Sequence, residues 1–268
     1  MLGLYDSGLG GLTVLAALRA AGIDQDVVYF ADQAHLPYGD KTDAQLHGFL
    51  GENLALLSEL HVDAVVTACN TTCAVAEQLG WPRTDFPVLD LIATAGASFA
   101  GTPYRRIGVV ATVATVRSGA YERAIRAAAP GVALFALAAP ALVPIVERGD
   151  TDTADAREAV AAVVAELPRN LDALVYGCSH YPLLDRWFAA ALAPNVARID
   201  PAHAQASAAA RLVAERGLAA GTAATTYYTN GDAAAFERAV RRWTGDAKGR
   251  VQPVRTGPTD FQKSASPV

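Results

Sequence analysis

The sequence has few cysteines and few charged residues, and each shortage excludes a class of protein. Only 3 of the 268 residues are cysteines. That number is too small for a disulfide framework, so we expect free thiols in a reducing compartment. Charged residues make up 18% of the chain, with 22 Lys and Arg against 27 Asp and Glu, and no basic run occurs. Because a phosphate backbone attracts dense positive charge, nucleic acid is not an expected partner.

Long hydrophobic runs are also missing, although 52% of the residues are hydrophobic. The Ala-rich stretch 124–141 is interrupted by Arg126, Pro130 and Pro140, and nowhere do 18 apolar residues follow one another. The start of the chain lacks the basic lead of an export signal and reaches Asp6 after five residues. We therefore expect a cytoplasmic protein with no membrane partner.

What the chain contains instead is an alternation of two patterns. Short β-branched and apolar runs predict buried strands at 1–5, 27–31, 64–68, 87–92, 107–111, 132–137, 173–177, 196–199 and 226–229. Helical spacing of apolar residues predicts helices at 12–21, 42–60, 117–128, 152–167, 204–215 and 233–243. Strands that alternate with helices predict parallel α/β sheets.

Polar residues follow several of these strands. Parallel α/β sheets bind ligands at the carboxyl ends of their strands, so these residues are the most informative ones. Residues 6–11 follow the first strand and 69–72 follow the third, while Thr112 and 178–181 follow strands in the second half. Cys69 and Cys178 are separated by about the length of one small domain. We interpret the chain as two similar α/β units that face each other, each contributing one thiol to a shared cleft.

The three cysteines differ in their expected roles. A free cysteine is commonly a buried small hydrophobe. Cys69 and Cys178, however, lie between a strand and the start of a helix, where the helix dipole favours a thiolate and lowers its pKa. Cys73 lies one turn beyond Cys69 and is predicted to be core packing. A zinc site on Cys69 and Cys73 would require a second closely spaced pair of ligands, which the sequence lacks, so no metal is expected.

The glycine-rich turn at 8–11 also fits a dinucleotide-binding motif. It follows a strand and opens a helix, and Asp32 ends the next strand, as an NAD site requires. The third glycine of that motif is replaced by Thr13, and the carboxylate of Asp6 would face the pyrophosphate. NAD binding is therefore a weaker alternative than an Asp-Ser pair directed into a cleft, and a turn without any ligand is the third interpretation.

Several other residues remain open between a structural and a functional role. Asn70 and Ser179 are suited to N-capping the next helix. His180 fits either a structural histidine at a helix start or an acid-base group beside a thiol. A solvated helix end is the default for Glu147. Residues 35–40 have turn chemistry, from which ligand contact by Tyr38 and Gly39 does not follow.

Six segments, taken together and in this order, resemble the signature segments of glutamate racemase, within the aspartate/glutamate racemase superfamily. They are 6–14 (DSGLGGLTV), 37–41 (PYGDK), 68–71 (ACNT), 112–121 with its TVRS core, 143–147 (VPIVE) and 177–184 (GCSHYPLL). The similarity continues to a late strand and turn at 228–232. Two cysteine motifs in one chain are far more specific than either motif alone.

The resemblance implies a racemase that needs no cofactor and supplies D-glutamate for cell-wall peptidoglycan. Carried over by position, Cys69 and Cys178 are the two acid-base residues, with Asp6 assisting Cys69, and Glu147 and His180 assisting Cys178. In similar enzymes the first thiol acts on the D-enantiomer and the second on the L-enantiomer. The implied contacts to the substrate, glutamate, come from Asp6, Ser7, Tyr38, Gly39, Asn70, Thr71, Ser179 and His180.

The resemblance also implies a fold of two flavodoxin-like, doubly wound parallel-sheet domains related by pseudo-symmetry, with the active site in the cleft between them. We expect residues 1–93 and 205–268 to form the first domain and 94–204 the second, and the chain to form a homodimer. The segment 93–96 departs from the family, which often has a proline-containing stretch there. Residues 252–268 show little periodicity and are predicted to end in a frayed tail.

Three alternatives remain at this point. The nearest in chemistry is a racemase for another amino acid, such as aspartate, since the contacts to the distal carboxylate are not placed by the sequence. An NAD-binding oxidoreductase using the turn at 8–11 belongs to a different class. The last is a non-catalytic binder of the racemase fold, because some family members are reported to inhibit DNA gyrase. The presence of both Cys69 and Cys178 argues against lost catalysis.

Overall fold

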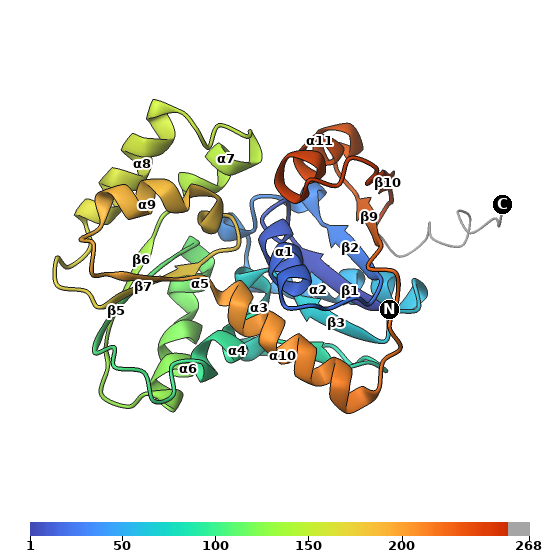
Figure 1. The fold of residues 1–268 in the computed structure, drawn as a ribbon, viewed down its shortest axis with the longest axis horizontal. Coiled ribbons are helices and arrows are strands. Elements are labelled where there is room, and N and C mark those ends of the chain that lie inside the picture. Colours follow the sequence, from blue (N-terminus) through green and yellow to red (C-terminus); the bar gives the residue numbers. More distant parts are fainter. Residues whose placement is uncertain (257–268) are drawn as a thin grey trace.

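The computed structural model describes residues 1–256 and contains two parallel β-sheets with helices packed on both faces of each (Figure 1). Its strands are β1 (Leu2–Asp6), β2 (Val27–Ala31), β3 (Ala64–Thr67), β4 (Val88–Leu89), β5 (Arg106–Ala111), β6 (Ala133–Ala138), β7 (Ala173–Gly177), β8 (Ala197–Ile199), β9 (Thr225–Thr229) and β10 (Val251–Pro253). Its α-helices are α1 (Leu12–Ala20), α2 (Asp43–Glu59), α3 (Asn70–Leu79), α4 (Leu91–Ala97), α5 (Val113–Ser118), α6 (Ala120–Ala128), α7 (Leu142–Glu147), α8 (Ala154–Ala165), α9 (Asp185–Ala191), α10 (Pro201–Arg216) and α11 (Ala233–Thr244).

The two sheets share one strand order. The larger sheet runs β10-β9-β2-β1-β3-β4 and the smaller one runs β6-β5-β7-β8, with every pair parallel. In each sheet, therefore, the first four strands along the chain stand in the order second, first, third, fourth. This order is the flavodoxin-like one. The predicted α/β fold with two related parallel-sheet domains is confirmed.

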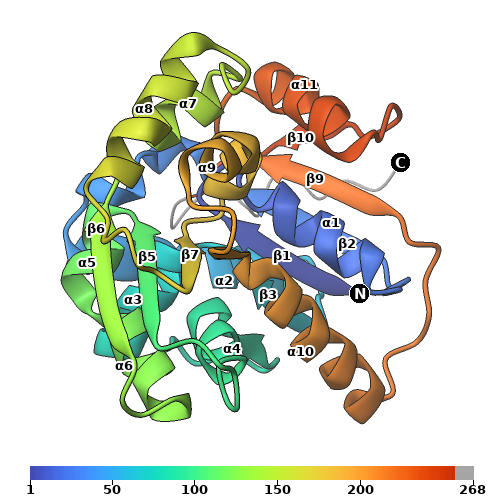
Figure 2. The ribbon, with the colours of Figure 1, turned by 60° about the vertical axis from the view of Figure 1, so that its left-hand side comes forward.

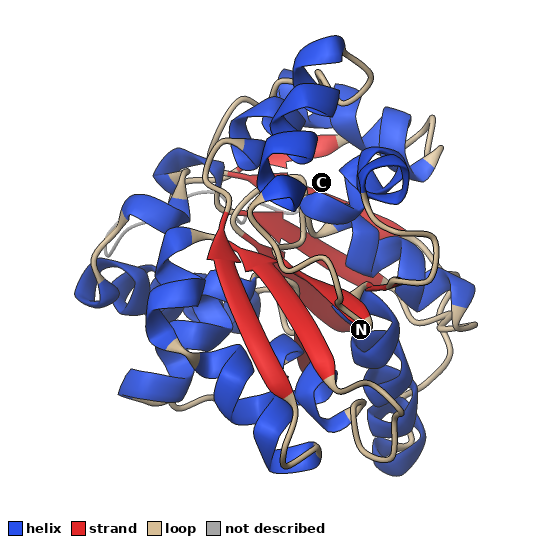
Figure 3. Ribbon diagram, turned by 90° about the vertical axis from the view of Figure 1, so that its left-hand side faces the viewer, coloured by secondary structure: helices blue, strands red, loops and turns tan. Residues whose placement is uncertain are grey.

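Side chains alternate between the two faces of each sheet, and both faces are covered. In β1, Leu4 belongs to the apolar cluster shared with α1, α10 and α11, whereas Tyr5 belongs to the cluster shared with α2. In β5, Val110 packs with α7, α8 and α9, whereas Val109 packs with α4 and α6. Strands buried on both sides in this way are the reason for their nearly continuous apolar sequences. Figure 3 shows the strands enclosed by helices.

The chain passes between the two sheets twice, through α4 and α10, which pack against each other (Figures 1 and 2). Gln205 of α10 ties this crossing to the larger sheet, since its Nε2 donates to the carbonyls of Thr67 and Leu89, both at 2.9 Å. The predicted domain limits at 93/94 and 204/205 fall inside α4 and α10 and stay predictions. In the part of the chain described, no helix has both the length and the apolar character that crossing a membrane requires.

Three predicted elements differ from the structure. The strand predicted at 87–92 ends early, because Asp90 caps α4 by accepting from the amide of Ala93 at 2.9 Å. The helix predicted at 117–128 is two helices, α5 and α6, separated by Gly119 in the left-handed region (φ +68°). The predicted tail begins with the short strand β10, and its last residues, 257–268, lie outside the described part.

The unusual segment 93–96 has a packing role. It lies in α4, and a Cβ added at Gly96 would stand 2.5 Å from the Cβ of Ala124 in α6. Small residues therefore allow the two helices to approach closely. We expect Gly96→Ala to lower the free energy of unfolding by about 1–3 kcal/mol through overpacking. Gly48→Ala in α2, where an added Cβ meets nothing within 4 Å, is expected to raise it by about 0.5–1 kcal/mol. Urea unfolding of both variants checks the contrast, and an equal effect of the two substitutions would contradict it.

Candidate active site

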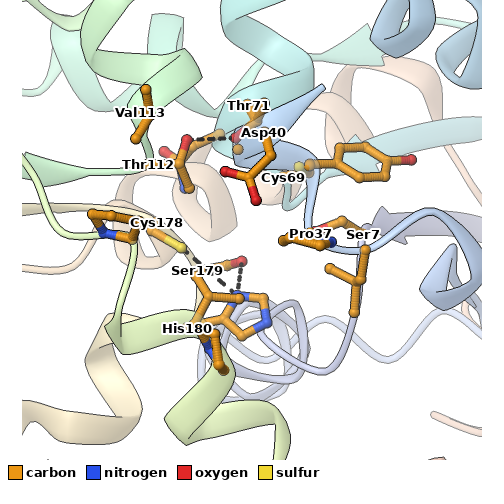
Figure 4. Close-up of a pocket in the computed structure, with 17 residues that line it drawn as sticks. Ser7, Pro37, Asp40, Cys69, Thr71, Thr112, Val113, Cys178, Ser179 and His180 are labelled. Carbon is orange, nitrogen blue, oxygen red and sulfur yellow. Dashed lines mark hydrogen bonds between the residues drawn. The ribbon is translucent and has the colours of Figure 1, made fainter. Parts of the chain in front are cut away.

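A cavity lies where the carboxyl ends of the two sheets meet. Figure 4 shows Cys178, Ser179 and His180 on one side of the space and Cys69 and Asp40 across from them. Its lining residues are Ser7, Leu36, Pro37, Tyr38, Gly39, Asp40, Cys69, Asn70, Thr71, Thr112, Val113, Pro140, Val143, Pro144, Cys178, Ser179 and His180. Both thiols therefore face one cavity from the ends of β3 and β7. In chain order, each of these is the third strand of its sheet.

Cys69 is a buried thiol with a raised pKa. Burial and the charge of Asp6 raise the pKa of Cys69 to about 12, although hydrogen bonds from Thr72 and Ser7 act in the other direction. The lowered pKa predicted from the start of α3 is therefore wrong, because loss of water outweighs the helix end. At neutral pH Cys69 is a thiol, able to donate a proton. Burial also raises the pKa of Asp6, which accepts from the amides of Gly8 and Gly11 and from Ser179.

Cys178 is paired with a charged histidine. Its sulfur lies 3.7 Å from Nδ1 of His180, and Nε2 of that ring lies 2.6 Å from Oε1 of Glu147. Burial opposes the charge on His180, but hydrogen bonds and charges from Cys178 and Glu147 outweigh it and raise the pKa of His180 well above its ordinary value. The same pairing lowers the pKa of Glu147 despite its burial. The two side chains thus form a buried imidazolium–carboxylate pair beside the second thiol.

The default interpretation of Glu147 as a solvated helix end is wrong. Its side chain is 18% exposed and also accepts from the amide of Leu9 at 3.0 Å. Glu147 comes from the smaller-sheet half of the molecule and Leu9 from the larger-sheet half, so this contact bridges the cleft. The N-capping roles expected for Asn70 and Ser179 are likewise absent, because neither side chain caps α3 or the turn after β7. Both line the cavity instead.

The space beside the glycine-rich turn at 8–11 is occupied by side chains of the protein. A Cβ at Gly10 would stand 2.5 Å from Nδ1 of His180 and from Oγ of Ser179. The amides of Gly8 and Gly11 are bound to Asp6. Since a pyrophosphate needs both the open space and the free amides of such a turn, these glycines serve close packing between the two halves.

The acidic residue of the NAD interpretation is occupied as well. Asp32 is fully buried and hydrogen-bonded to four side chains, those of His35, Tyr38, Asn53 and Asn230. A carboxylate held in this way is not free to bind a ribose hydroxyl. Through Tyr38 it fixes the loop that carries Gly39 against the cavity.

Donors for an anionic ligand gather on one wall. The amide oxygen of Asn70 accepts from Tyr121 at 2.6 Å, which leaves its buried Nδ2 without a partner. Thr71 lies 2.8 Å from Thr112 (oxygen to oxygen), and both contact Thr115. Thr112 also lines the cavity but was not among the predicted ligand contacts, although its place after β5 was the available signal.

Cys73 lies away from this chemistry. It is fully buried in the apolar cluster of α4 and α6, and its sulfur is 3.1 Å from the hydroxyl oxygen of Thr67. Unlike Cys69, it does not line the cavity. Its predicted role in core packing is confirmed.

Comparison with known proteins gives a consistent answer. The family model described as Asp/Glu/Hydantoin racemase matches residues 13–209. The chain belongs to this family. A curated glutamate racemase from Gloeobacter violaceus is 40% identical over 260 residues, which cover 96% of this chain and 97% of that protein. The resemblance to glutamate racemase and the assignment to a racemase, an isomerase, are confirmed.

Solved structures of the family have the same architecture. Glutamate racemase isoform RacE1 from Bacillus anthracis superposes with a TM-score of 0.86 at 29% identity, covering 95% of this chain and 97% of that one. The glutamate racemase from Francisella tularensis subsp. tularensis SCHU S4, solved in complex with D-glutamate, gives 0.85 at 27% identity and the same coverage. The arrangement of two parallel-sheet halves is therefore part of a fold shared with these enzymes.

The structure brings the predicted site residues of this family member together. Nine of them line the cavity, namely Ser7, Tyr38, Gly39, Asn70, Thr71, Ser179, His180 and the two cysteines. Asp6 and Glu147 stand behind this layer, hydrogen-bonded to Ser179 and His180. Their position suits groups that act on the lining residues and not on a ligand directly.

Proposed function

We propose that the protein interconverts L- and D-glutamate by proton transfer at Cα, with Cys69 and Cys178 as the two acid-base groups and no cofactor. The observation that carries the proposal is the placement of two thiols in one cavity, on equivalent strand ends of two related sheets. Inversion of a stereocentre needs a base on one face of Cα and an acid on the other, with the roles exchanged in the reverse direction.

The surroundings of the two thiols support opposite protonation states. Cys69, whose pKa is about 12, enters the reaction as the acid. Protonated His180 can donate its Nδ1–H to a thiolate at Cys178, which makes Cys178 the base. Glu147 and Asp6 act as positioning residues, the first by holding the imidazolium and the second by orienting Ser179. After one inversion the two thiols have exchanged their states.

The lining suits a small dicarboxylate. None of the lining residues in the described chain is a lysine or arginine, so carboxylates would bind to amide and hydroxyl donors and to His180. Ser7, Asn70, Thr71 and Ser179 supply such donors, together with the backbone at Tyr38 and Gly39. Fixed donors of this kind also stabilise the negative charge that develops when the Cα proton leaves. Glutamate is favoured over aspartate because the curated relatives matched over nearly the whole chain are glutamate racemases.

The proposal extends to the setting of the enzyme. A racemase of this kind would supply D-glutamate for peptidoglycan, in the cytoplasm and as a homodimer. The domains of 1–93 with 205–268 and of 94–204 would then move as bodies around the cleft. Closure of such a cleft excludes water, which competes for the carbanion.

The test uses the purified protein in deuterated water under reducing conditions. With L-glutamate and no added cofactor, optical rotation is expected to decay to zero while the Cα position of the product gains deuterium. Parallel reactions with L-aspartate, and with NAD added, test the two alternative functions. A protein that leaves glutamate unchanged, that prefers aspartate, or that acts only when NAD is added would contradict the proposal.

A further inference from the structure

A chain of buried hydroxyl groups extends from Cys69 into the larger-sheet half of the molecule. Hydrogen bonds from the side chain and the amide of Thr72 act on the sulfur of Cys69 and lower its pKa, against the larger effect of burial. Oγ1 of Thr72 lies 3.1 Å from the hydroxyl oxygen of Tyr5, which lies 2.9 Å from that of Tyr38. The exposed fractions of Thr72, Tyr5 and Tyr38 are 1%, 0% and 3%. These three hydroxyls therefore form a continuous, largely buried line.

The far end of the line is an acid-base pair that meets solvent. Tyr38 donates to the carboxylate of Asp32, and Oδ1 of Asp32 lies 2.7 Å from Nδ1 of His35. Asp32 is fully buried, whereas the side chain of His35 is 27% exposed. The hydrogen-bonded line thus runs from Thr72, next to the buried thiol, to a half-buried imidazole.

These groups are suited to passing a proton on. A hydroxyl both donates and accepts, so each can receive a proton on one side while releasing its own on the other. Burial raises the pKa of Tyr5 and of Tyr38 well above the ordinary value, so both remain neutral hydroxyls. An apolar phenylalanine would satisfy the packing of Tyr5 in β1, where its ring stacks on Phe30. The hydroxyl of Tyr5 is therefore not explained by packing.

The proposed reaction creates a need for such a connection. Each inversion leaves Cys69 and Cys178 in exchanged protonation states, which must be reset before the same enantiomer is used again. Cys178 contacts His180 and, through it, Glu147, which is 18% exposed. Cys69 is 4% exposed and has no titratable side chain among its hydrogen-bond partners Thr72 and Ser7. The line of hydroxyl groups gives Cys69 a corresponding route for exchanging its proton with solvent.

We propose, on the basis of the proposed function, that Thr72, Tyr5 and Tyr38 form a proton path that exchanges the Cys69 proton with solvent at the Asp32–His35 pair. In one passage the S–H bond of Cys69 breaks and its proton goes to Thr72. The protons of Thr72, Tyr5 and Tyr38 each move one oxygen further, so that an O–H bond forms on Asp32 and a thiolate remains at Cys69. Exchange with solvent at His35 and the reverse passage return a solvent proton to the thiol.

The experiment measures deuterium in the starting enantiomer. Cα-protiated D- and L-glutamate are incubated separately in deuterated water, the reaction is stopped at low conversion, and the unreacted substrate is recovered. Deuterium in it reports that the thiol exchanged its proton before returning one. Since Cys69 removes the proton of only one enantiomer, Tyr5→Phe is expected to lower this deuterium about tenfold for one enantiomer and to leave the other unchanged.

Two further variants sharpen the test. Thr72→Val cuts the line at its first hydroxyl and is expected to give the same one-sided loss. Tyr176→Phe removes a buried hydroxyl outside the line, one bonded to Asp185, and is expected to label both enantiomers as the unmodified protein does. Three outcomes would overturn the path while racemisation itself continues. Tyr5→Phe could leave the deuterium content of both enantiomers unchanged, or lower it equally in both. The unmodified protein could also place no deuterium in the enantiomer whose Cα proton Cys69 removes. Absence of all racemisation in the unmodified protein contradicts the proposed function instead.

Discussion

Cys69→Ser and Cys178→Ser are each expected to lower racemisation by at least about 10³-fold, within the range that one acid-base group supplies. The reason is the proposed mechanism, in which the two thiols that line the cavity each serve one face of Cα. A serine side chain has nearly the shape of cysteine, but its hydroxyl is a far weaker acid than a thiol. It therefore forms the deprotonated base less readily and donates its proton less readily. Each variant retains one functional thiol. It is therefore expected to exchange the Cα proton of one enantiomer with retention of configuration, which proton NMR in deuterated water detects.

The matched control is the third cysteine. Cys73→Ser changes a buried thiol that packs beside Thr67 and does not line the cavity. It should keep most of the activity and both exchange reactions. Near-normal turnover in either of the first two variants, or loss of turnover in Cys73→Ser equal to theirs, would be incompatible with the assignment of two acid-base thiols.

Glu147→Gln is expected to lower kcat/KM about 10²-fold at neutral pH and to move the alkaline limb of its pH profile to lower pH. The carboxylate of Glu147 and the sulfur of Cys178 together raise the pKa of His180 well above its ordinary value. A group with a raised pKa is protonated below that pKa and loses its proton as the pH rises through it. Without the charge of Glu147 the imidazolium is lost at lower pH, and the donor to the Cys178 thiolate is lost with it.

The measurement is kcat/KM for both enantiomers across the pH range in which the unmodified protein stays folded. Glu158→Gln is the matched control, because Glu158 lies on the exposed face of α8 and its nearest ion-pair partner, Arg157, is 3.8 Å away. That variant should follow the profile of the unmodified protein. An unshifted alkaline limb in Glu147→Gln would show that Glu147 does not set the protonation of His180.

Short sequence patterns predicted most of the fold, because strands and helices form from the properties of neighbouring residues. Apolar runs marked every strand from β1 to β9 but not β10, and residues 173–177 agree with β7 at both ends. The prediction failed where a single residue overrode the pattern of apolar residues around it. Asp90 starts α4 inside an apolar run that otherwise fits a strand, and Gly119 breaks a stretch with continuous helical spacing. One capping bond or one left-handed residue is enough to redirect a segment whose propensity is weak.

The residues of the site were predictable because they follow strand ends, where parallel sheets place ligands. Asp6, Cys69, Asn70, Cys178 and His180 were found in this way, and the family resemblance added a role for Glu147. Thr112 stood after a strand as well but carried no motif that distinguished it. Tyr5 gave no signal, since a tyrosine in an apolar run fits packing equally well. Thr72 stood in the segment 69–72 after a strand but carried no motif that distinguished it.

The sequence by itself determined the alternation of strands and helices, the placement of two thiols at equivalent strand ends and the family. Only the tertiary structure decided the chemical state of Cys69. Burial beside Asp6 raises the pKa of Cys69 to about 12, against the prediction from its helix start. Glu147, 33 residues away in sequence from His180, becomes its hydrogen-bond partner and bridges to Leu9, 138 residues away. Desolvation and charge act through space, so distances along the chain do not predict them.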